Sequence, residues 1–136
     1  MDQQIQQQPA QTLQKRVLVV EDEQYLRELY IKIMVEEGYM VDSAADGDEA
    51  YAKMYAGGYD LVILDIMLPK MDGLKVLEKL NTISPPLKPN KAVVLLSNLG
   101  QDDVVAKGLT LGVRGYLVKS DYTPDLLVRE LRQYLV

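Results

Sequence analysis

The feature that most limits the possible folds is a run of four apolar residues, Leu61 to Leu64, followed directly by the carboxylate of Asp65. A continuous apolar run this short, half of it β-branched, is typical of a strand that is buried on both faces. Such strands occur in parallel sheets that carry helices on both sides. After Asp65, Pro69 and Gly73 indicate a turn before helical periodicity resumes. Because open parallel sheets bind ligands at the carboxyl ends of their strands, the sequence predicts a site around Asp65.

The rest of the chain alternates short apolar runs with amphipathic segments. The runs predict four further strands, at residues 16–20, 39–44, 92–96 and 116–118. Apolar residues that recur every three or four positions predict five helices, which include residues 26–34, 50–55, 74–80, 102–111 and 123–134. Thr123-Pro124 is a typical helix start, and Gly38 and Gly112 are typical of helix ends. This alternation predicts an α/β fold with a doubly wound, five-stranded parallel sheet and five helices on both faces.

Composition sets the domain boundaries. Residues 1–14 contain seven glutamines and few apolar side chains, so burial cannot offset the entropy cost of ordering them. We expect residues 1–14 to form a disordered Gln-rich tail and residues 15–136 to form one domain of ordinary size. Three prolines between Ser84 and Asn90 predict an exposed loop. No output domain is expected after the last helix.

Charge and missing residue types exclude several functions. The net charge of −5 argues against a nucleic-acid-binding surface, which needs clustered Lys and Arg. The chain has no cysteine, which excludes disulfides and thiolate chemistry, and no histidine, which excludes imidazole catalysis and a phospho-histidine of its own. No apolar run approaches the roughly 20 residues that a membrane span needs. A cytoplasmic location without membrane insertion is the expectation.

Chemically reactive side chains follow four of the predicted strands. They are Glu21 and Asp22, Asp65, Ser97 and Lys119. In this architecture the four strand ends meet at one edge of the sheet, where the carboxylates would repel one another unless a cation lay among them. Oxygen ligands of this kind suit Mg²⁺, while an ammonium and a hydroxyl suit phosphate oxygens. The set therefore predicts an Asp that accepts a phosphoryl group with the help of Mg²⁺.

These motifs resemble the receiver domain of two-component response regulators over roughly residues 16 to 135. The resemblance implies a flavodoxin-like sheet with strand order 2-1-3-4-5. It also implies that Asp65 is the phosphoacceptor, that a histidine kinase or phosphotransfer protein is the donor, and that Lys119 assists. By the same resemblance Glu21, Asp22, Asp65 and the backbone carbonyl of Met67 hold Mg²⁺.

The resemblance further implies a switch. Ser97 would turn to the phosphoryl group and Tyr116 would move inward, which alters the face made by the fourth helix, fifth strand and fifth helix. That face would control binding of a downstream protein. Homodimerisation through the last helices is a further possibility, for which the sequence suggests an exposed apolar patch at Leu126, Val128 and Leu135.

Some positions depart from the family pattern or modify its expected behaviour. Ser120 stands where the family usually has Pro, and Asn98 is bulkier than the small residue usual at its position. Met67 and Leu99, which flank the site, are apolar and predict slow self-dephosphorylation. The protein is thus expected to be a phosphoacceptor rather than an enzyme.

Alternatives from other classes remain. A flavodoxin-like cofactor binder or a P-loop enzyme would need glycine-rich phosphate loops that the acidic loop after the first strand does not provide. A Mg²⁺-dependent aspartyl-phosphate hydrolase would need an additional substrate-binding segment. The main alternative is a phosphorylation-independent, receiver-like interaction module.

Overall fold

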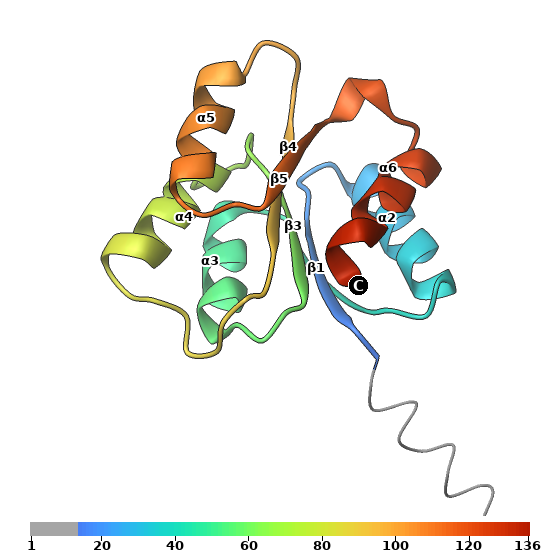
Figure 1. The fold of residues 1–136 in the computed structure, drawn as a ribbon, viewed down its shortest axis with the longest axis horizontal. Coiled ribbons are helices and arrows are strands. Elements are labelled where there is room, and N and C mark those ends of the chain that lie inside the picture. Colours follow the sequence, from blue (N-terminus) through green and yellow to red (C-terminus); the bar gives the residue numbers. More distant parts are fainter. Residues whose placement is uncertain (1–13) are drawn as a thin grey trace, which may run out of the picture.

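The computed structural model describes residues 14–136, in which strands and helices alternate from end to end (Figure 1). The strands are β1 (Arg16–Val20), β2 (Met40–Ala44), β3 (Leu61–Asp65), β4 (Val93–Ser97) and β5 (Gly115–Val118). The α-helices are α2 (Gln24–Glu36), α3 (Gly47–Ala56), α4 (Gly73–Thr82), α5 (Asp102–Thr110) and α6 (Pro124–Leu131). Two short 3₁₀ helices, η1 (Lys119–Asp121) and η2 (Arg132–Leu135), flank α6. The predicted tail, apart from Gln14, lies outside the described residues.

All five strands are parallel and lie in the order β2-β1-β3-β4-β5, which confirms the predicted doubly wound, flavodoxin-like topology. The register places Val20 beside Leu64, Asp65 beside Leu96, and Ser97 beside Val118. Because neighbouring strands end nearly level, their carboxyl ends form one edge of the sheet. The residues that follow β1 and β5 and those that end β3 and β4 therefore meet there.

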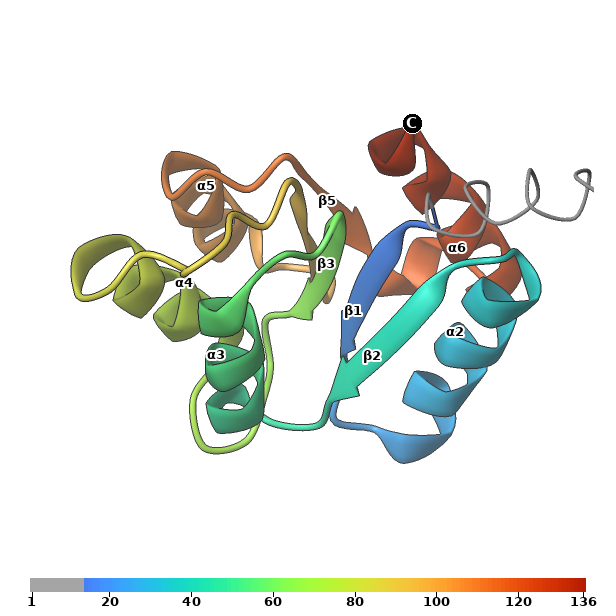
Figure 2. The same cartoon turned by 90° about the horizontal axis from the view of Figure 1, so that it is seen from below.

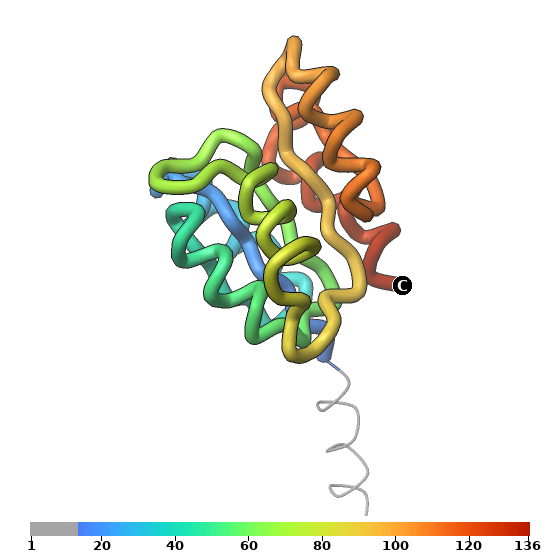
Figure 3. Tube along the Cα trace, turned by 90° about the vertical axis from the view of Figure 1, so that its left-hand side faces the viewer, coloured from blue at the N-terminus to red at the C-terminus, as the bar shows by residue number. Residues whose placement is uncertain are grey.

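Helices cover both faces of the sheet and make two separate apolar cores. Helices α3, α4 and α5 lie on one face, and α2 and α6 pack together on the other (Figures 1 and 2). Seen from the side, α3 and α4 run next to each other in front of the sheet (Figure 3). Side chains of β3 alternate between the cores, so Val62 and Leu64 join one and Leu61 and Ile63 the other. This two-sided burial is why the strand sequences are continuous apolar runs rather than alternating ones.

The helix ends follow the expected chemistry. The side chain of Thr123 accepts a hydrogen bond from the backbone of α6, and Pro124 begins that helix, as predicted. Gly38 and Gly112 end α2 and α5 with φ angles of 96° and 98°, a left-handed conformation that glycine adopts without strain. Asp72 caps α4 by accepting from the Lys75 N–H, which fixes the start of the helix next to Asp65.

The predicted apolar patch on the last helix is wrong for two of its three residues. Val128 and Leu135 are buried in the core between the sheet and α2, and only Leu126 is exposed. The turn of about 100° per residue places Leu127, Val128 and Leu131 on the buried face and directs Leu126 away from it. Within residues 14–136, no helix has the length and apolar character that a membrane crossing requires.

Candidate functional site

The acidic pair follows β1 directly, and the two carboxylates have different surroundings. The Glu21 N–H extends the sheet by donating to the Ala44 carbonyl (3.1 Å), which leaves the Glu21 side chain only 1% exposed. Glu21 Oε2 accepts from the Glu23 N–H (3.1 Å), and the Glu23 carboxylate in turn caps α2. Asp22 is exposed, and no hydrogen bond to its carboxylate is found within residues 14–136. One carboxylate is thus held rigidly, and the other faces solvent.

Asp65 ends β3 and is 2% exposed. Its Oδ1 atom accepts from the Met67 N–H at 3.2 Å, and its Oδ2 atom accepts from Lys119 Nζ at 2.7 Å. The chain then turns sharply, and the Gly73 N–H donates to the Ile66 carbonyl (2.8 Å). A side chain at Gly73 would collide with the Asp65 carbonyl, so the glycine allows α4 to begin this close to the site.

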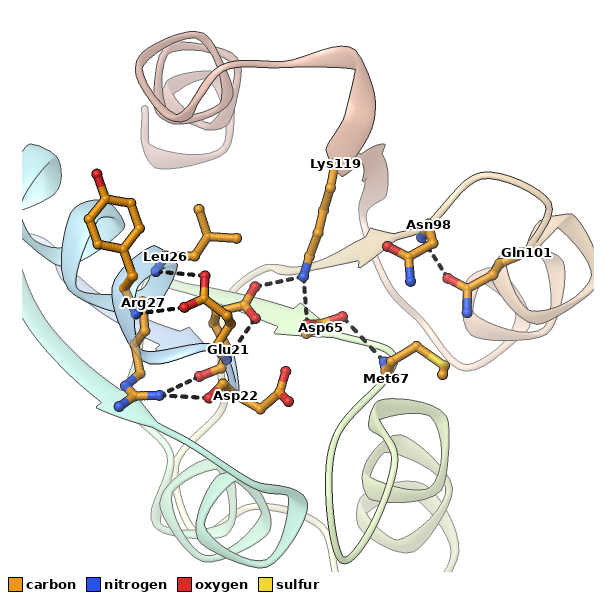
Figure 4. Close-up of polar contacts among 11 residues, drawn as sticks. Glu21, Asp22, Leu26, Arg27, Asp65, Met67, Asn98, Gln101 and Lys119 are labelled. Atoms are coloured by element: carbon orange, nitrogen blue, oxygen red, sulfur yellow. Dashed lines mark hydrogen bonds and ion pairs between the residues drawn. The ribbon is translucent and has the colours of Figure 1, made fainter.

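Lys119 connects the two buried carboxylates (Figure 4). It follows β5 in the 3₁₀ turn η1, and its Nζ lies 2.7 Å from both Glu21 Oε1 and Asp65 Oδ2. The Lys119 side chain points at both carboxylates although the next residue is Ser120 and not Pro. The structure therefore places Lys119 in the site that the sequence predicts.

Burial and crowding disturb the protonation of these groups. Burial raises the pKa of Asp65 above its ordinary value, although the hydrogen bond from Lys119 acts in the opposite direction. Burial likewise raises the pKa of Glu21, which Lys119 lowers and the neighbouring Asp65 charge raises further. For Lys119, burial lowers the pKa, but the two carboxylates outweigh it and the net shift is upward. One ammonium therefore serves two carboxylates that burial makes costly to ionise.

The acidic side chains fit a divalent cation. Glu21, Asp22 and Asp65 each offer an oxygen, and these oxygens lie within 4.8 Å of one another. Hard oxygen ligands with room for water suit Mg²⁺. An open hollow of about 400 Å³, lined by Asp22, Met67, Leu68, Pro69 and Asp72, lies on the Asp22 side of this group. Met67 lies next to Asp65 with its side chain 57% exposed, so it borders the approach to the site.

The two predicted switch residues lie near this edge but do not contact Asp65. Ser97 is buried at the end of β4, and its hydroxyl faces the Leu117 carbonyl at a long 3.5 Å. Tyr116, on β5, is 48% exposed. Ser97 thus lies on the correct edge with its hydroxyl turned elsewhere, and Tyr116 points outward.

Two residues that the sequence analysis did not single out also contact the loops of the site. Arg27 donates to the carbonyls of both Glu21 and Asp22 (2.9 and 3.2 Å), and Gln101 Oε1 accepts from the Asn98 N–H (2.6 Å). Both act on backbone groups. Such contacts leave no periodic signal in a sequence.

The fold and this cluster of carboxylates with one lysine are those of a receiver domain. The family model of the response regulator receiver domain matches residues 17–132, and the chain belongs to that family.

Relatives of known sequence support this membership. The chain is 42% identical over 107 residues to the chemotaxis protein CheY of Treponema pallidum, covering 76% of this chain and 72% of CheY. It is 38% identical over 114 residues to the transcriptional regulatory protein DltR of Streptococcus agalactiae, covering 84% of this chain but only 49% of DltR. The chain thus spans about half the length of that regulator.

A solved structure agrees. The CheY-like receiver domain protein of Methanospirillum hungatei superposes with a TM-score of 0.77 at 27% identity, covering 90% of this chain and 94% of that one.

Proposed function

We propose that the protein is a phosphorylation-dependent signalling switch in which Asp65 accepts a phosphoryl group from the phospho-histidine of a partner kinase or phosphotransfer protein. The observation that carries the proposal is the position of Asp65: buried, at the carboxyl edge of the sheet, bonded to Lys119 and within reach of two more carboxylates. As a receiver domain, the protein belongs to a class of signalling proteins. That it acts as a phosphoacceptor rather than as an enzyme is part of the same proposal, as is a cytoplasmic location.

The chain's own groups suit this transfer. An Asp65 oxygen attacks the phosphorus, and the new P–O bond forms as the P–N bond to the donor imidazole breaks, with the electron pair remaining on that nitrogen. Lys119 and the Met67 N–H already point at Asp65, so they can donate to the oxygens of the incoming group without rearrangement. Mg²⁺, held by Glu21, Asp22, Asp65 and the Met67 carbonyl, would supply the remaining positive charge.

The switch starts from the weak contact of Ser97. The Ser97 hydroxyl donates only a long hydrogen bond of 3.5 Å to the Leu117 carbonyl, so it loses little when it turns to donate to a phosphoryl oxygen. That movement would draw the end of β4 toward Asp65 and open room for Tyr116 to turn inward from its exposed position on β5. The face formed by α5, β5 and α6 changes, and with it the affinity for a downstream protein.

Phosphorylation with a small donor tests the proposal. The purified protein is incubated with acetyl phosphate, with and without Mg²⁺, and its intact mass is measured. We expect a gain of one phosphoryl group that requires Mg²⁺, is absent in Asp65→Asn and is retained in Asp103→Asn, a control at an exposed helix position. No adduct under any condition, with Mg²⁺ binding intact, would instead favour a phosphorylation-independent interaction module.

The lifetime of the adduct depends on the flanking side chains. Met67 and Leu99 are 57% and 80% exposed, and neither can orient a water molecule toward the acyl phosphate. We expect slow self-dephosphorylation in the wild type and a shorter phosphoryl lifetime in Met67→Asn and Leu99→Glu. The lifetime is measured as the rate at which the phosphorylated mass disappears. Lifetimes equal to that of the wild type would contradict this role.

A further inference from the structure

The carboxylate best able to receive a cation is the least restrained one. Glu21 Oε1 and Asp65 Oδ2 are bonded to Lys119, and Glu21 Oε2 and Asp65 Oδ1 accept from backbone N–H groups. Both carboxylate oxygens of Asp22 are without a hydrogen-bond partner in the described part of the chain. Asp22 is therefore the acidic group with full capacity for a divalent ion, yet no hydrogen bond or ion pair among residues 14–136 holds its carboxylate in place.

What restrains Asp22 is its backbone, and the restraint comes from Arg27. One guanidinium nitrogen, Nη1, donates to the carbonyl of Glu21 at 2.9 Å and to the carbonyl of Asp22 at 3.2 Å. Arg27 lies in the first turns of α2, whose start Glu23 fixes by capping it. The guanidinium is thus tied to a rigid element, and it holds two consecutive peptide groups of the loop.

The two hydrogen bonds from Arg27 affect the direction in which the Asp22 carboxylate points. Figure 4 shows the Arg27 guanidinium on one side of the loop and the Asp22 carboxylate on the other, toward Asp65. Three carboxylates with oxygens within 4.8 Å repel one another, and this repulsion favours rotation of the exposed Asp22 away from the site. Two hydrogen bonds to the peptide groups on either side of the Asp22 Cα oppose a backbone rotation and so fix the direction of the Cα–Cβ bond, which leaves the carboxylate only its side-chain torsions by which to turn away.

We infer that Arg27 is a positioning residue, which orients the Asp22 carboxylate for a divalent cation by holding the peptide carbonyls of Glu21 and Asp22. The inference rests on the magnesium site of the proposed function. Arg27 does not touch the cation, and its effect is to reduce the conformational freedom that binding would otherwise remove.

The direction in which the Mg²⁺ affinity changes when Arg27 is replaced distinguishes a positioning role from a purely electrostatic one. Arg27 carries a positive charge near a cation site, so removing that charge alone would strengthen Mg²⁺ binding. Loss of positioning has the opposite effect and weakens it. Residues that orient metal ligands typically contribute about 10- to 100-fold in affinity.

The test is isothermal titration of Mg²⁺ into the wild type, Arg27→Met and the matched control Lys32→Met. Lys32 lies on the same helix with its side chain 70% exposed and pairs only with Glu36 within the described residues, so its loss removes an equal charge without touching the loop. We expect the dissociation constant for Mg²⁺ to rise about tenfold in Arg27→Met and to stay unchanged or fall in Lys32→Met. An unchanged or lower constant in Arg27→Met would overturn the inference, as would the absence of Mg²⁺ binding to the wild type.

The melting temperature gives two further readouts. Without Mg²⁺ it should be nearly equal in the wild type and Arg27→Met. With Mg²⁺ it should rise in both proteins, but a given rise should need a higher Mg²⁺ concentration in Arg27→Met. If Arg27→Met does not fold, Arg27→Gln, whose amide nitrogen lies two bonds nearer to the backbone than the guanidinium nitrogen that makes both hydrogen bonds, takes its place, and a wild-type dissociation constant for Mg²⁺ would then overturn the inference. Failure of the wild type to accept a phosphoryl group, with the tenfold difference intact, would refute the phosphoacceptor role and not the positioning role.

Discussion

Two clusters of charged residues on this domain differ in how their carboxylates are compensated: one has too few partners for its carboxylates, and the other has several partners for a single carboxylate. The edge cluster, Glu21, Asp22, Asp65 and Lys119, places one ammonium among three carboxylates. The β2 cluster, Asp42, Lys53 and Tyr59, surrounds one carboxylate with a lysine (2.9 Å) and a tyrosine hydroxyl (2.8 Å).

The pKa shifts record the difference between these clusters. Burial raises the pKa of Asp65 and is not fully opposed by Lys119. Burial also acts on Asp42, but hydrogen bonds from Lys53 and Tyr59 outweigh it and hold the pKa below its ordinary value. A carboxylate with its own partners is a structural group, whereas carboxylates that share an insufficient cation store repulsion that a metal ion or a protonation event can release.

Removing the lysine of each cluster should give the largest contrast. Lys119→Met leaves the buried Glu21 and Asp65 carboxylates without a cation, and we expect a loss of about 3 kcal/mol in the free energy of unfolding at neutral pH. Lys53→Met removes a less buried partner and should cost about 1 kcal/mol or less. Urea unfolding measures both; equal losses would show that the edge cluster is no more dependent on its cation than the β2 cluster.

Magnesium should stabilise only through the edge cluster. A ligand at 100 times its dissociation constant adds about 2.7 kcal/mol to the free energy of unfolding, and the melting temperature should rise accordingly. Asp22→Asn should remove most of this rise, and Asp42→Asn should preserve it, because the Asp42 carboxylate is already satisfied. A magnesium response that survives in Asp22→Asn would place the cation elsewhere.

The same substitution should have opposite signs in the two clusters. Asp65→Asn removes a buried negative charge while Lys119 keeps Glu21 as a partner, so we expect it to stabilise the metal-free protein by about 1 kcal/mol. Asp42→Asn removes a charge-assisted acceptor of Lys53 and should destabilise by about 1 kcal/mol. The unfolding midpoints of the two variants, compared with the wild type, decide the matter: a shift in the same direction would mean that the clusters do not differ in kind.

How much of this could be predicted from the sequence depends on whether a residue acts through its position or through its rotamer. The meeting of Asp65, Ser97 and Lys119 at one edge follows from parallel strands in near register, which the buried apolar runs already indicate. The family resemblance supplied the roles of these residues and the strand order.

Other features depended on angles and backbone contacts that a sequence pattern does not encode. The burial of Val128 depended on the rotation of α6, where a one-residue error in phase turns a face by about 100°, and the burial of Leu135 depended on the change from α-helix to the 3₁₀ helix η2. The bonds of Arg27 to two carbonyls depended on a side chain crossing a loop, for which residue type alone gives no signal. The orientation of the Ser97 hydroxyl toward Leu117 is likewise a rotamer that only the packed structure decides.

Lowering the pH should produce the smallest of these differences in stability, because it removes the charge of Asp42 directly. The pKa of Asp42 lies below its ordinary value of 3.8, so its ionised form is favoured in the folded state, and the resulting stability is present above pH 3.8 and lost as the pH falls through the lower folded value. Because the side chain is 45% exposed and solvent screens it, we expect a contribution of less than about 0.5 kcal/mol. The difference in unfolding free energy between the wild type and Asp42→Asn should therefore narrow as the pH is lowered from 3.8 through the folded-state value, since both side chains are uncharged below that value. A difference that stays constant would mean that Asp42 stabilises the fold through the shape of its hydrogen bonds rather than through its charge, and the contrast with the edge cluster would then be one of geometry alone.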